Sequence, residues 1–311
     1  MLVAQDDTEQ LGVIEELIAR SSFLHLTNSR DYYPYSKGDG LPLIRIETPV
    51  CSAIIALQGA QLLEFQPAGG KQLLWLSPNC NFTAGTALRG GVPICLPWFG
   101  PHETDSTKPK HGFARNLDWS LVDAHILDTG AIQIKFEFTH QPNELCESAF
   151  TAELTMTLGD TAKIKLNLIN QSNAPFINSW ALHSYFPVKS LQETSVIGVA
   201  GRDYFDTADK LTQKFQASEV VFNGEVDRVF PSIDNGLSIE GSPRIYISHY
   251  NCPSVIVWNP GADNAAKITD IGSGVEQGFV CVERGAVLGE KWNLAAGESQ
   301  CAWIEIKELA D

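Results

Sequence analysis

The sequence predicts an all-β fold, and three observations carry that prediction. Apolar and polar residues alternate with a period of two over residues 132–139, 152–158 and 164–168. Such alternation is typical of antiparallel strands that bury one face. Gly159 and Asp160, between the second and third runs, favour a tight turn. Because no long amphipathic helices separate the runs, a parallel α/β sheet is not expected.

The other segments agree with this class. Residues 244–250 and 301–307 also alternate, and residues 253–260 have the continuous apolar character of a more buried strand. Near the start, apolar residues recur with a period of 3.6 over residues 9–20, which predicts a helix. Residues 30–42 are rich in Pro, Gly and Tyr, which predicts a loop.

The chain has neither an internal repeat nor a linker rich enough in Pro, Gly or Ser to divide it. Its 311 residues are 44% hydrophobic, which is enough to build one large core. We therefore expect a single domain of two packed sheets over residues 31–311. Residues 1–30 are expected to form an N-terminal helical extension packed on that domain.

The charge balance excludes whole classes of partner. The 22 Lys and Arg residues against 37 Asp and Glu residues give a formal net charge of −15. Nucleic-acid binding and attachment to an anionic membrane surface need the opposite sign, so neither is expected. The acidic first residues do not resemble a signal peptide and no apolar run approaches a membrane span, which predicts a cytoplasmic protein. Seven scattered cysteines without a C-x-x-C pair predict reduced thiols.

Two segments between residues 85 and 117 reverse the local charge. Four cations against two acidic residues give a sum of 4 − 2 = +2; the cations are Arg89, Lys108, Lys110 and Arg115. The run 88–101 (LRGGVPICLPWFGP) predicts either a buried structural turn or a place where the Gly90–Gly91 backbone approaches a ligand beside Arg89. The run 108–116 (KPKHGFARN) predicts either a solvated loop or, through Arg115, part of a site for an anionic group.

A histidine and a glutamate stand out because both lie in apolar runs. His183 is in the aromatic and apolar run 179–188 (SWALHSYFPV), which predicts a strand, and Glu283 follows four apolar residues in 278–285 (GFVCVERG). A buried carboxyl group needs a reason, and a carboxylate with an imidazole can act as an acid/base pair. The alternatives are a hydrogen-bonded core histidine and a glutamate at a strand edge. No histidine pair has metal-ligand spacing and no cofactor motif occurs, so neither a metal nor an organic cofactor is expected.

Six segments, taken in order, resemble the aldose 1-epimerase (galactose mutarotase-like) superfamily, and most closely its glucose-6-phosphate 1-epimerase branch. They span most of the chain, and six in order are far more specific than any one of them. The segments are LRGGVPICLPWFGP (88–101), HGFARNLDW (111–119), ALHSYF (181–186), EVDRVF (225–230), VWNP (257–260) and CVERG (281–285). One departure is Gly261, which stands where this branch often has a bulky residue after the proline.

The resemblance implies a β-supersandwich of large antiparallel sheets with an active-site cleft on a concave sheet face. It implies an isomerase that interconverts the α and β anomers of D-glucose 6-phosphate without a metal or organic cofactor. The alternatives are an aldose 1-epimerase for free sugars and a non-catalytic carbohydrate-binding protein of the same fold. A β-sandwich glycoside hydrolase, with Asp227 and Glu283 as its two carboxylates, is a further rival. We expect the chain to be a monomer.

The resemblance also assigns roles to residues. His183 is implied as the general acid and Glu283 as the general base, which calls for a protonated histidine and an ionised glutamate in the free enzyme. Asp227 is implied to bind sugar hydroxyls, with Asp206 as the second choice. The remaining assignments are Arg89 and Arg115 for the 6-phosphate, and His111 as a further residue of the cleft.

Overall fold

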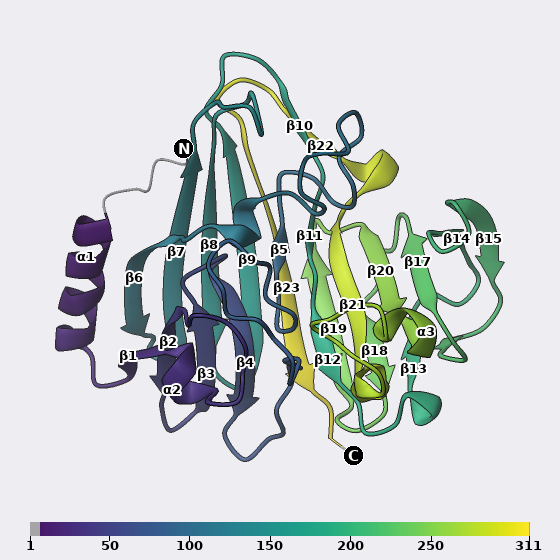
Figure 1. The fold of residues 1–311 in the computed structure, drawn as a ribbon, viewed down its shortest axis with the longest axis horizontal. Coiled ribbons are helices and arrows are strands. Elements are labelled where there is room, and N and C mark those ends of the chain that lie inside the picture. Colours follow the sequence, from purple (N-terminus) through teal and green to yellow (C-terminus); the bar gives the residue numbers. More distant parts are fainter. Residues whose placement is uncertain (1–6, 311) are drawn as a thin grey trace.

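A computed structural model of the protein describes residues 7–310 (Figure 1). The predicted all-β class is confirmed, because antiparallel sheets dominate and the helices are few. The nine-stranded sheet has the order β16 (Val220–Val221), β13 (Ser195–Ile197), β18 (Leu237–Glu240), β19 (Ile245–Tyr250), β23 (Ser299–Glu308), β9 (Ala162–Asn170), β8 (Phe150–Leu158), β7 (Ile132–His140) and β6 (Ser120–Ile126).

The eight-stranded sheet carries the residues discussed below. Its order is β15 (Thr212–Gln216), β14 (Arg202–Asp206), β17 (Val226–Phe230), β20 (Ser254–Asn259), β21 (Phe279–Ala286), β11 (Trp180–Leu182) and β5 (Ile94–Cys95), and β12 (Tyr185–Pro187) also pairs with β21. A four-stranded sheet consists of β1 (Leu24–Asn28), β2 (Pro42–Glu47), β3 (Cys51–Ala56) and β4 (Gln61–Pro67). A two-stranded sheet pairs β10 (Phe176–Asn178) with β22 (Trp292–Leu294).

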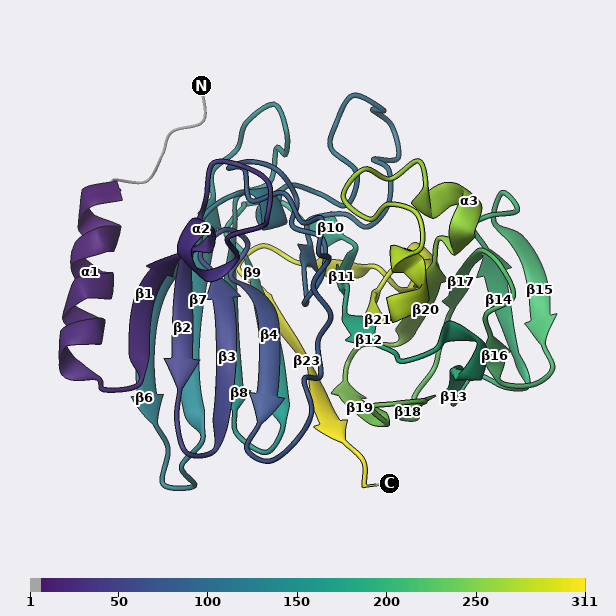
Figure 2. The same cartoon turned by 60° about the horizontal axis from the view of Figure 1, so that its bottom comes forward.

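The sheets are stacked in layers. The four-stranded sheet lies over the β6–β9 end of the nine-stranded sheet, and the eight-stranded sheet lies beside it, over the end that holds β13, β18 and β19 (Figure 2). One hydrophobic core cluster takes side chains from all four sheets, among them Ile55, Leu154, Val257 and Leu294. The galactose mutarotase-like sandwich implied by the resemblance is therefore the observed architecture, with more than the two sheets predicted from alternation.

The strands predicted by period-two alternation are confirmed. In β7, β8 and β9 every second residue is buried, and the three strands pair in register. A tight turn at residues 159–161 joins β8 to β9, and a longer loop at residues 141–149 joins β7 to β8. Apolar burial on one face, at about 25 cal/mol per Å², stabilises this arrangement and fixes the register, because a slip by one residue would expose the whole apolar set.

The N-terminal region contains more regular structure than predicted. The helix predicted over residues 9–20 is α1 (Asp7–Arg20), which packs along the edge strand β6 and buries Ile14 (Figure 1). The loop predicted over 30–42 was wrong at its start, where α2 (Ser29–Tyr32) forms because the Asn28 side chain accepts a hydrogen bond from the backbone N–H of Arg30 (2.9 Å). A third helix is α3 (Gly261–Ala265).

Residues 1–6 of the predicted N-terminal extension lie outside the described residues. The boundary at residue 30 stays a prediction, although β1, which precedes it, is hydrogen-bonded to β2. Between residues 7 and 310, no helix combines the length and the apolar character that crossing a bilayer requires. All seven cysteines are free thiols, as predicted.

Candidate active site

Strand β21 presents its two faces to different surroundings. Val280 and Val282 point into the main core, whereas Cys281 and Glu283 point to the opposite face of the eight-stranded sheet. Every residue of the strand is buried, and Glu283 is 1% exposed. The strand therefore holds a carboxyl group in a place where water does not solvate it.

His183 lies in a break between two short strands. The sequence predicts one strand over residues 179–188, but β11 ends at Leu182 and β12 begins at Tyr185. The prediction was wrong at this point because a tight turn interrupts the strand, where the backbone N–H of Ser184 donates to the carbonyl of Leu182 two residues earlier (3.0 Å). The break turns the imidazole toward β21, where Nε2 lies 3.3 Å from Oε1 of Glu283.

Burial decides how this pair is protonated. The pKa of Glu283 is raised well above its ordinary value of 4.5, first by burial and then by the charge of Asp227. The pKa of His183 is lowered well below 6.5, first by burial and then by the charges of Arg115 and Arg89. Both directions favour a neutral pair with its proton on Glu283, which is opposite to the ionisation expected from the sequence for the free enzyme. His183 Nδ1 and Glu283 Oε2 are buried and lack a hydrogen-bond partner in the described chain.

Asp227 lies on the same face of the sheet as Glu283. The register pairs Asp227 of β17 with Trp258 of β20, and Trp258 with Cys281 of β21, so these side chains form a row beside the glutamate. Burial raises the pKa of Asp227 to about 6, against a smaller lowering by the charge of Lys110. The carboxyl group of Asp227 therefore lies near the His183–Glu283 pair and can titrate close to neutral pH.

Asp206 does not join this group. It is paired in register with Arg228, the neighbour of Asp227, so its side chain points to the other face of the sheet. There its carboxylate forms an ion pair with Nζ of Lys214 (2.8 Å). Of the two acids considered for sugar hydroxyls, the structure brings only Asp227 close to Glu283.

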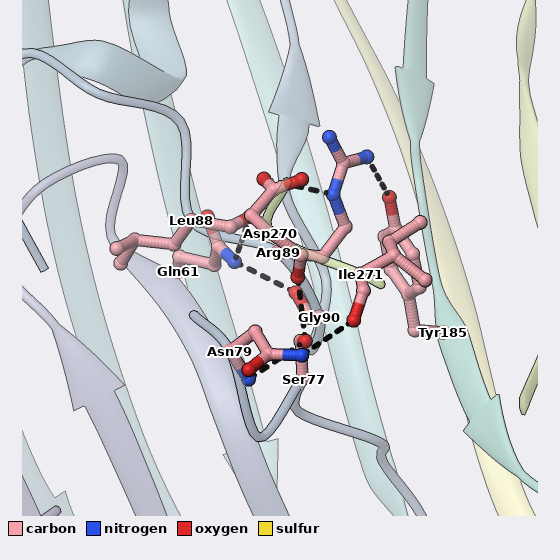
Figure 3. A network of polar contacts seen from close by, with 9 residues as sticks. All are labelled: Gln61, Ser77, Asn79, Leu88, Arg89, Gly90, Tyr185, Asp270 and Ile271. Atoms are coloured by element: carbon pink, nitrogen blue, oxygen red, sulfur yellow. Dashed lines mark hydrogen bonds and ion pairs between the residues drawn. The ribbon is translucent and has the colours of Figure 1, made fainter. Parts of the chain in front are cut away.

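Arg89 reaches the pair through one aromatic ring. Its Nε donates to Asp270 Oδ2 (3.1 Å), and its Nη1 donates to the hydroxyl oxygen of Tyr185 (2.9 Å; Figure 3). The Tyr185 ring in turn stacks on the imidazole of His183, with the ring centroids 4.9 Å apart. Asp270 comes from a distant segment and offsets part of the +2 charge summed over residues 85–117.

Hydrogen bonds from Gln61 and Ser77 fix the two segments that carry Arg89 and Asp270 (Figure 3). The side-chain amide of Gln61 donates to the carbonyls of Leu88 (3.3 Å) and Gly90 (2.7 Å), one on each side of the arginine. The Ser77 hydroxyl donates to the carbonyl of Asp270 (2.6 Å). These buried hydrogen bonds fix the guanidinium and its carboxylate partner relative to the sheet.

The two glycines after Arg89 serve packing. Gly90 and Gly91 have positive φ values of 130° and 59°. A Cβ atom on Gly90 would collide with the carbonyl oxygen of Trp75, and one on Gly91 with that of Leu62. The close approach is to protein backbone, so a buried structural turn explains the glycines, while Arg89 alone reaches the site.

Arg115 supplies a second guanidinium. It lies in the 3₁₀ turn η1 (Ala114–Asn116), where its Nη2 donates to the carbonyl of Lys110 (3.0 Å). Its buried Nε has no hydrogen-bond partner among residues 7–310. The charges of Arg115 and Lys110 act on both His183 and Glu283, and each lowers the pKa of the two groups.

His111 forms an aromatic wall next to the pair. Its ring lies 4.8 Å from that of Phe99 and 5.6 Å from that of His183. Its Nδ1 accepts a hydrogen bond from the backbone N–H of Gly100 (3.2 Å), which leaves Nε2 to carry the proton of the neutral ring. Burial, followed by the charge of Arg115, lowers the pKa of His111 well below 6.5.

Comparison with known proteins identifies the chain's relatives. The family model of aldose 1-epimerase matches residues 42–307. The chain belongs to the aldose 1-epimerase family.

Three proteins similar to this chain show which members of the family it resembles. A protein of Escherichia coli with the provisional name glucose-6-phosphate 1-epimerase is 36% identical over 79% of this chain and 84% of its own length. One of Cenchrus ciliaris with the same provisional name is 32% identical over 78% and 79%. The crystal structure of a provisionally named mutarotase from Salmonella typhimurium superposes with a TM-score of 0.83 and 29% identity, covering 95% of this chain and 98% of that one.

Sequence reasoning missed several residues of this aldose 1-epimerase family member. Tyr185 and Trp258 lie inside the quoted motifs ALHSYF and VWNP, so a signal for them existed. Asp270 lies outside every motif, and only the tertiary contact with Arg89 reveals it. Cys281 was counted only as a buried thiol, yet its Sγ lies within 4.8 Å of a ligand atom of His183 and of Glu283.

Chemically, the arrangement supports proton transfer next to an anion site. The site lies between two apolar clusters on the outer face of the eight-stranded sheet, one around Ile256 and one around Phe279. The structure also has a groove between α1 and β6, but none of the candidate active-site residues lines it. An apolar wall, a close carboxyl–imidazole pair and converging cations are the features that a polar substrate with one charged end requires.

Proposed function

We propose that the protein is an isomerase that interconverts the α and β anomers of a hexose 6-phosphate, with D-glucose 6-phosphate as its substrate. The observation that carries the proposal is the 3.3 Å contact between His183 Nε2 and Glu283 Oε1 in a buried, cation-flanked site. The provisional names of the relatives from Escherichia coli and Cenchrus ciliaris support the same substrate.

The reaction needs two proton transfers close together. A base removes the proton from the C1 hydroxyl while an acid protonates the ring oxygen, and the bond between C1 and the ring oxygen breaks to give the open-chain aldehyde. Rotation about C1–C2 presents the other face of the carbonyl, and the reverse transfers close the ring. Both oxygens are bonded to C1, so two groups in contact, such as His183 and Glu283, can serve both transfers. Each positioned transfer contributes about 10²–10⁴-fold in rate.

In this mechanism Glu283 is the base and His183 the acid, so the shared proton must lie on His183 when the ring opens. In the free protein, burial favours the proton on Glu283. The cations that lower the pKa of His183 include Arg115, Arg89 and Lys110. Arg115 and Lys110 lower the pKa of both groups, whereas Arg89 acts on His183 and not on Glu283. A phosphate dianion bound at Arg89 would neutralise that charge, which makes His183 easier to protonate relative to Glu283 and favours transfer of the proton across the 3.3 Å contact.

The phosphate is assigned to Arg89 and Arg115, because a guanidinium presents a planar pair of donors that matches phosphate oxygens. Arg115 has an unpartnered buried Nε, and Arg89 is preset by Asp270 and Tyr185. Asp227 is assigned to the sugar hydroxyls in preference to Asp206, whose carboxylate is already paired with Lys214. His111 is assigned to the wall of the cleft.

Two alternatives make different predictions. An aldose 1-epimerase for free sugars would act on glucose and glucose 6-phosphate equally, and Arg115 would be dispensable. A non-catalytic carbohydrate-binding protein would bind sugar without accelerating anomerisation, and it would not need a carboxyl–imidazole pair. The cations around the pair favour the phosphosugar enzyme.

The test is anomerisation itself. Freshly dissolved α-D-glucose 6-phosphate is followed by polarimetry, or at equilibrium by exchange NMR, with and without the protein. We expect a large acceleration for the phosphosugar and a much smaller one for glucose. An unchanged rate for both sugars would overturn the proposal, and equal acceleration of both would favour the free-sugar enzyme.

A further inference from the structure

Three potential metal ligands converge on the outer face of β21. His183, Cys281 and Glu283 each offer one ligand atom, and all three atoms lie within 4.8 Å of one another. Cys281 and Glu283 are two residues apart on one strand, so they share a face, and the break after β11 brings His183 against them. All three side chains are buried.

The spacing suits a tetrahedral ion. Zinc binds nitrogen and oxygen at about 2.0–2.2 Å and thiolate sulfur at about 2.3 Å, which separates neighbouring ligands by about 3.3–3.6 Å. The contact between His183 Nε2 and Glu283 Oε1 is 3.3 Å. Cys281 Sγ lies at most 4.8 Å from the ligand atoms of His183 and Glu283. A small movement of the cysteine side chain would therefore bring the sulfur to the distance that a shared ion requires.

A second observation points to a ligand at this place. The buried side chains of His183 (6% exposed) and Glu283 (1% exposed) keep Nδ1 and Oε2 without a hydrogen-bond partner within residues 7–310. Buried polar atoms of this kind are normally paired, so unpaired ones mark a site that is completed from outside. Sugar hydroxyls can pair with both atoms, whereas a cation held by His183 Nε2 can take up Oε2 of Glu283 but not Nδ1 of the same imidazole.

Charge selects the kind of cation. The charges of Arg89, Arg115 and Lys110 act on this cluster and oppose a bare dication. A zinc ion that displaces one proton from the carboxyl and one from the thiol leaves the total charge unchanged, which a buried site requires. A hard cation such as Mg²⁺ gains little from sulfur and prefers oxygen ligands, and the cluster has one carboxylate only.

We propose that His183, Cys281 and Glu283 bind a thiophilic divalent cation such as Zn²⁺, which occupies the acid/base pair and competes with the sugar. Zinc is an inhibitor here and no cofactor, because it takes up the groups that transfer protons. The binding site stands on the geometry of the cluster, whereas the inhibition rests on the proposed function.

The binding test uses the metal alone. The full-length protein, freed of metal with a chelator and desalted, is titrated with Co²⁺, whose bond to a thiolate gives a charge-transfer absorption band. We expect one ion per chain with this band, displacement by Zn²⁺, and no effect of excess Mg²⁺. X-ray absorption of the zinc-loaded wild type should show one sulfur at about 2.3 Å together with nitrogen and oxygen ligands at about 2.0–2.2 Å, which needs no variant.

Variants separate this site from adventitious thiol binding. Cys281→Ala should remove the cobalt band and weaken Zn²⁺ binding by about 100-fold, since one of three ligands is lost. Cys301→Ser is the matched control, because Cys301 is a more exposed free thiol and should leave binding unchanged. A band that survives in C281A or disappears in C301S, or a zinc spectrum without sulfur, would overturn the site.

The inhibition is measured separately. Zn²⁺ should slow anomerisation of glucose 6-phosphate by the wild type and by C301S, with relief at high substrate, and C281A should need about 100-fold more Zn²⁺. If the protein lacks anomerase activity, the proposed function fails while the metal site is still decided by cobalt absorption. Bound zinc that leaves the rate of an active enzyme unchanged would overturn the inhibition.

Discussion

Glu283 and Arg284 are neighbours on β21, and both are buried, yet their surroundings are opposite. Arg284 points to the core side, where its guanidinium donates to the carbonyl of Ile233 (2.7 Å), to that of Cys252 (3.3 Å) and to that of Asn235. Glu283 points to the other face, where His183 is 3.3 Å away and Oε2 has no partner in the described part of the chain.

The difference separates a structural charge from a reactive one. Burial lowers the pKa of Arg284 to about 10, so the group remains charged at neutral pH, and three carbonyls compensate for its lost hydration. Glu283 lacks such compensation, and its pKa is raised instead. Both residues are buried, but Arg284 is held by backbone carbonyls and keeps its charge, whereas Glu283 contacts the titratable His183, to which a proton can pass.

The largest effect is expected on the site face. Glu283→Gln keeps the shape of the side chain and removes the base, so anomerisation of glucose 6-phosphate should fall by about 10³-fold. The free energy of unfolding should not fall, because Glu283 has few polar contacts to lose. Polarimetry and urea unfolding measure the two quantities, and wild-type kinetics in this variant would remove Glu283 from the mechanism.

Arg284→Met should show the reverse pattern on the core face. Loss of the guanidinium leaves buried carbonyls unpaired, which should lower the free energy of unfolding by about 3 kcal/mol. The specific activity of the folded protein should remain within a few-fold of wild type. Equal losses of activity in the Glu283 and Arg284 variants would break the distinction between the two faces.

The cations on the site face provide a sharper comparison. Arg115→Ala should lower kcat/KM for glucose 6-phosphate by about 10- to 100-fold through loss of a charge-assisted contact, and should hardly change it for glucose. Lys108→Ala is the matched control from the same segment, since the charge of Lys108 acts on Asp105 and Cys146 instead. A similar loss on both sugars would argue against phosphate recognition by Arg115.

Asp227 gives an effect on stability that depends on pH. Its pKa is raised from 3.8 to about 6, so between these values the folded protein keeps a proton that the unfolded chain releases. The free energy of unfolding of the wild type therefore falls as the pH rises through this window, and Asp227→Asn removes that fall. The stability of D227N relative to wild type should increase from pH 3.8 to pH 6 and stay constant above it. An identical pH dependence for both proteins in thermal unfolding would show that Asp227 is not desolvated.

The sequence determined the local structure and the chemical groups. Alternation predicted β7, β8 and β9 with their buried faces, because a strand's side-chain period is a property of the strand itself. The motifs predicted that His183 and Glu283 belong to one site. Their roles, and those assigned to Arg89 and Arg115, stay predictions until the variants are measured.

Tertiary structure alone decided which groups meet. The contact of His183 with Glu283, the register that places Asp227 in a row with Cys281, and the ion pair of Arg89 with Asp270 each join segments far apart in the chain. Period and composition fix which way a side chain points from its own strand, whereas contact depends on strand order and register, which packing of the whole core selects. The pKa directions of the His183–Glu283 pair also come from the assembled sheets, because burial raises the pKa of the carboxyl group and lowers that of the imidazole.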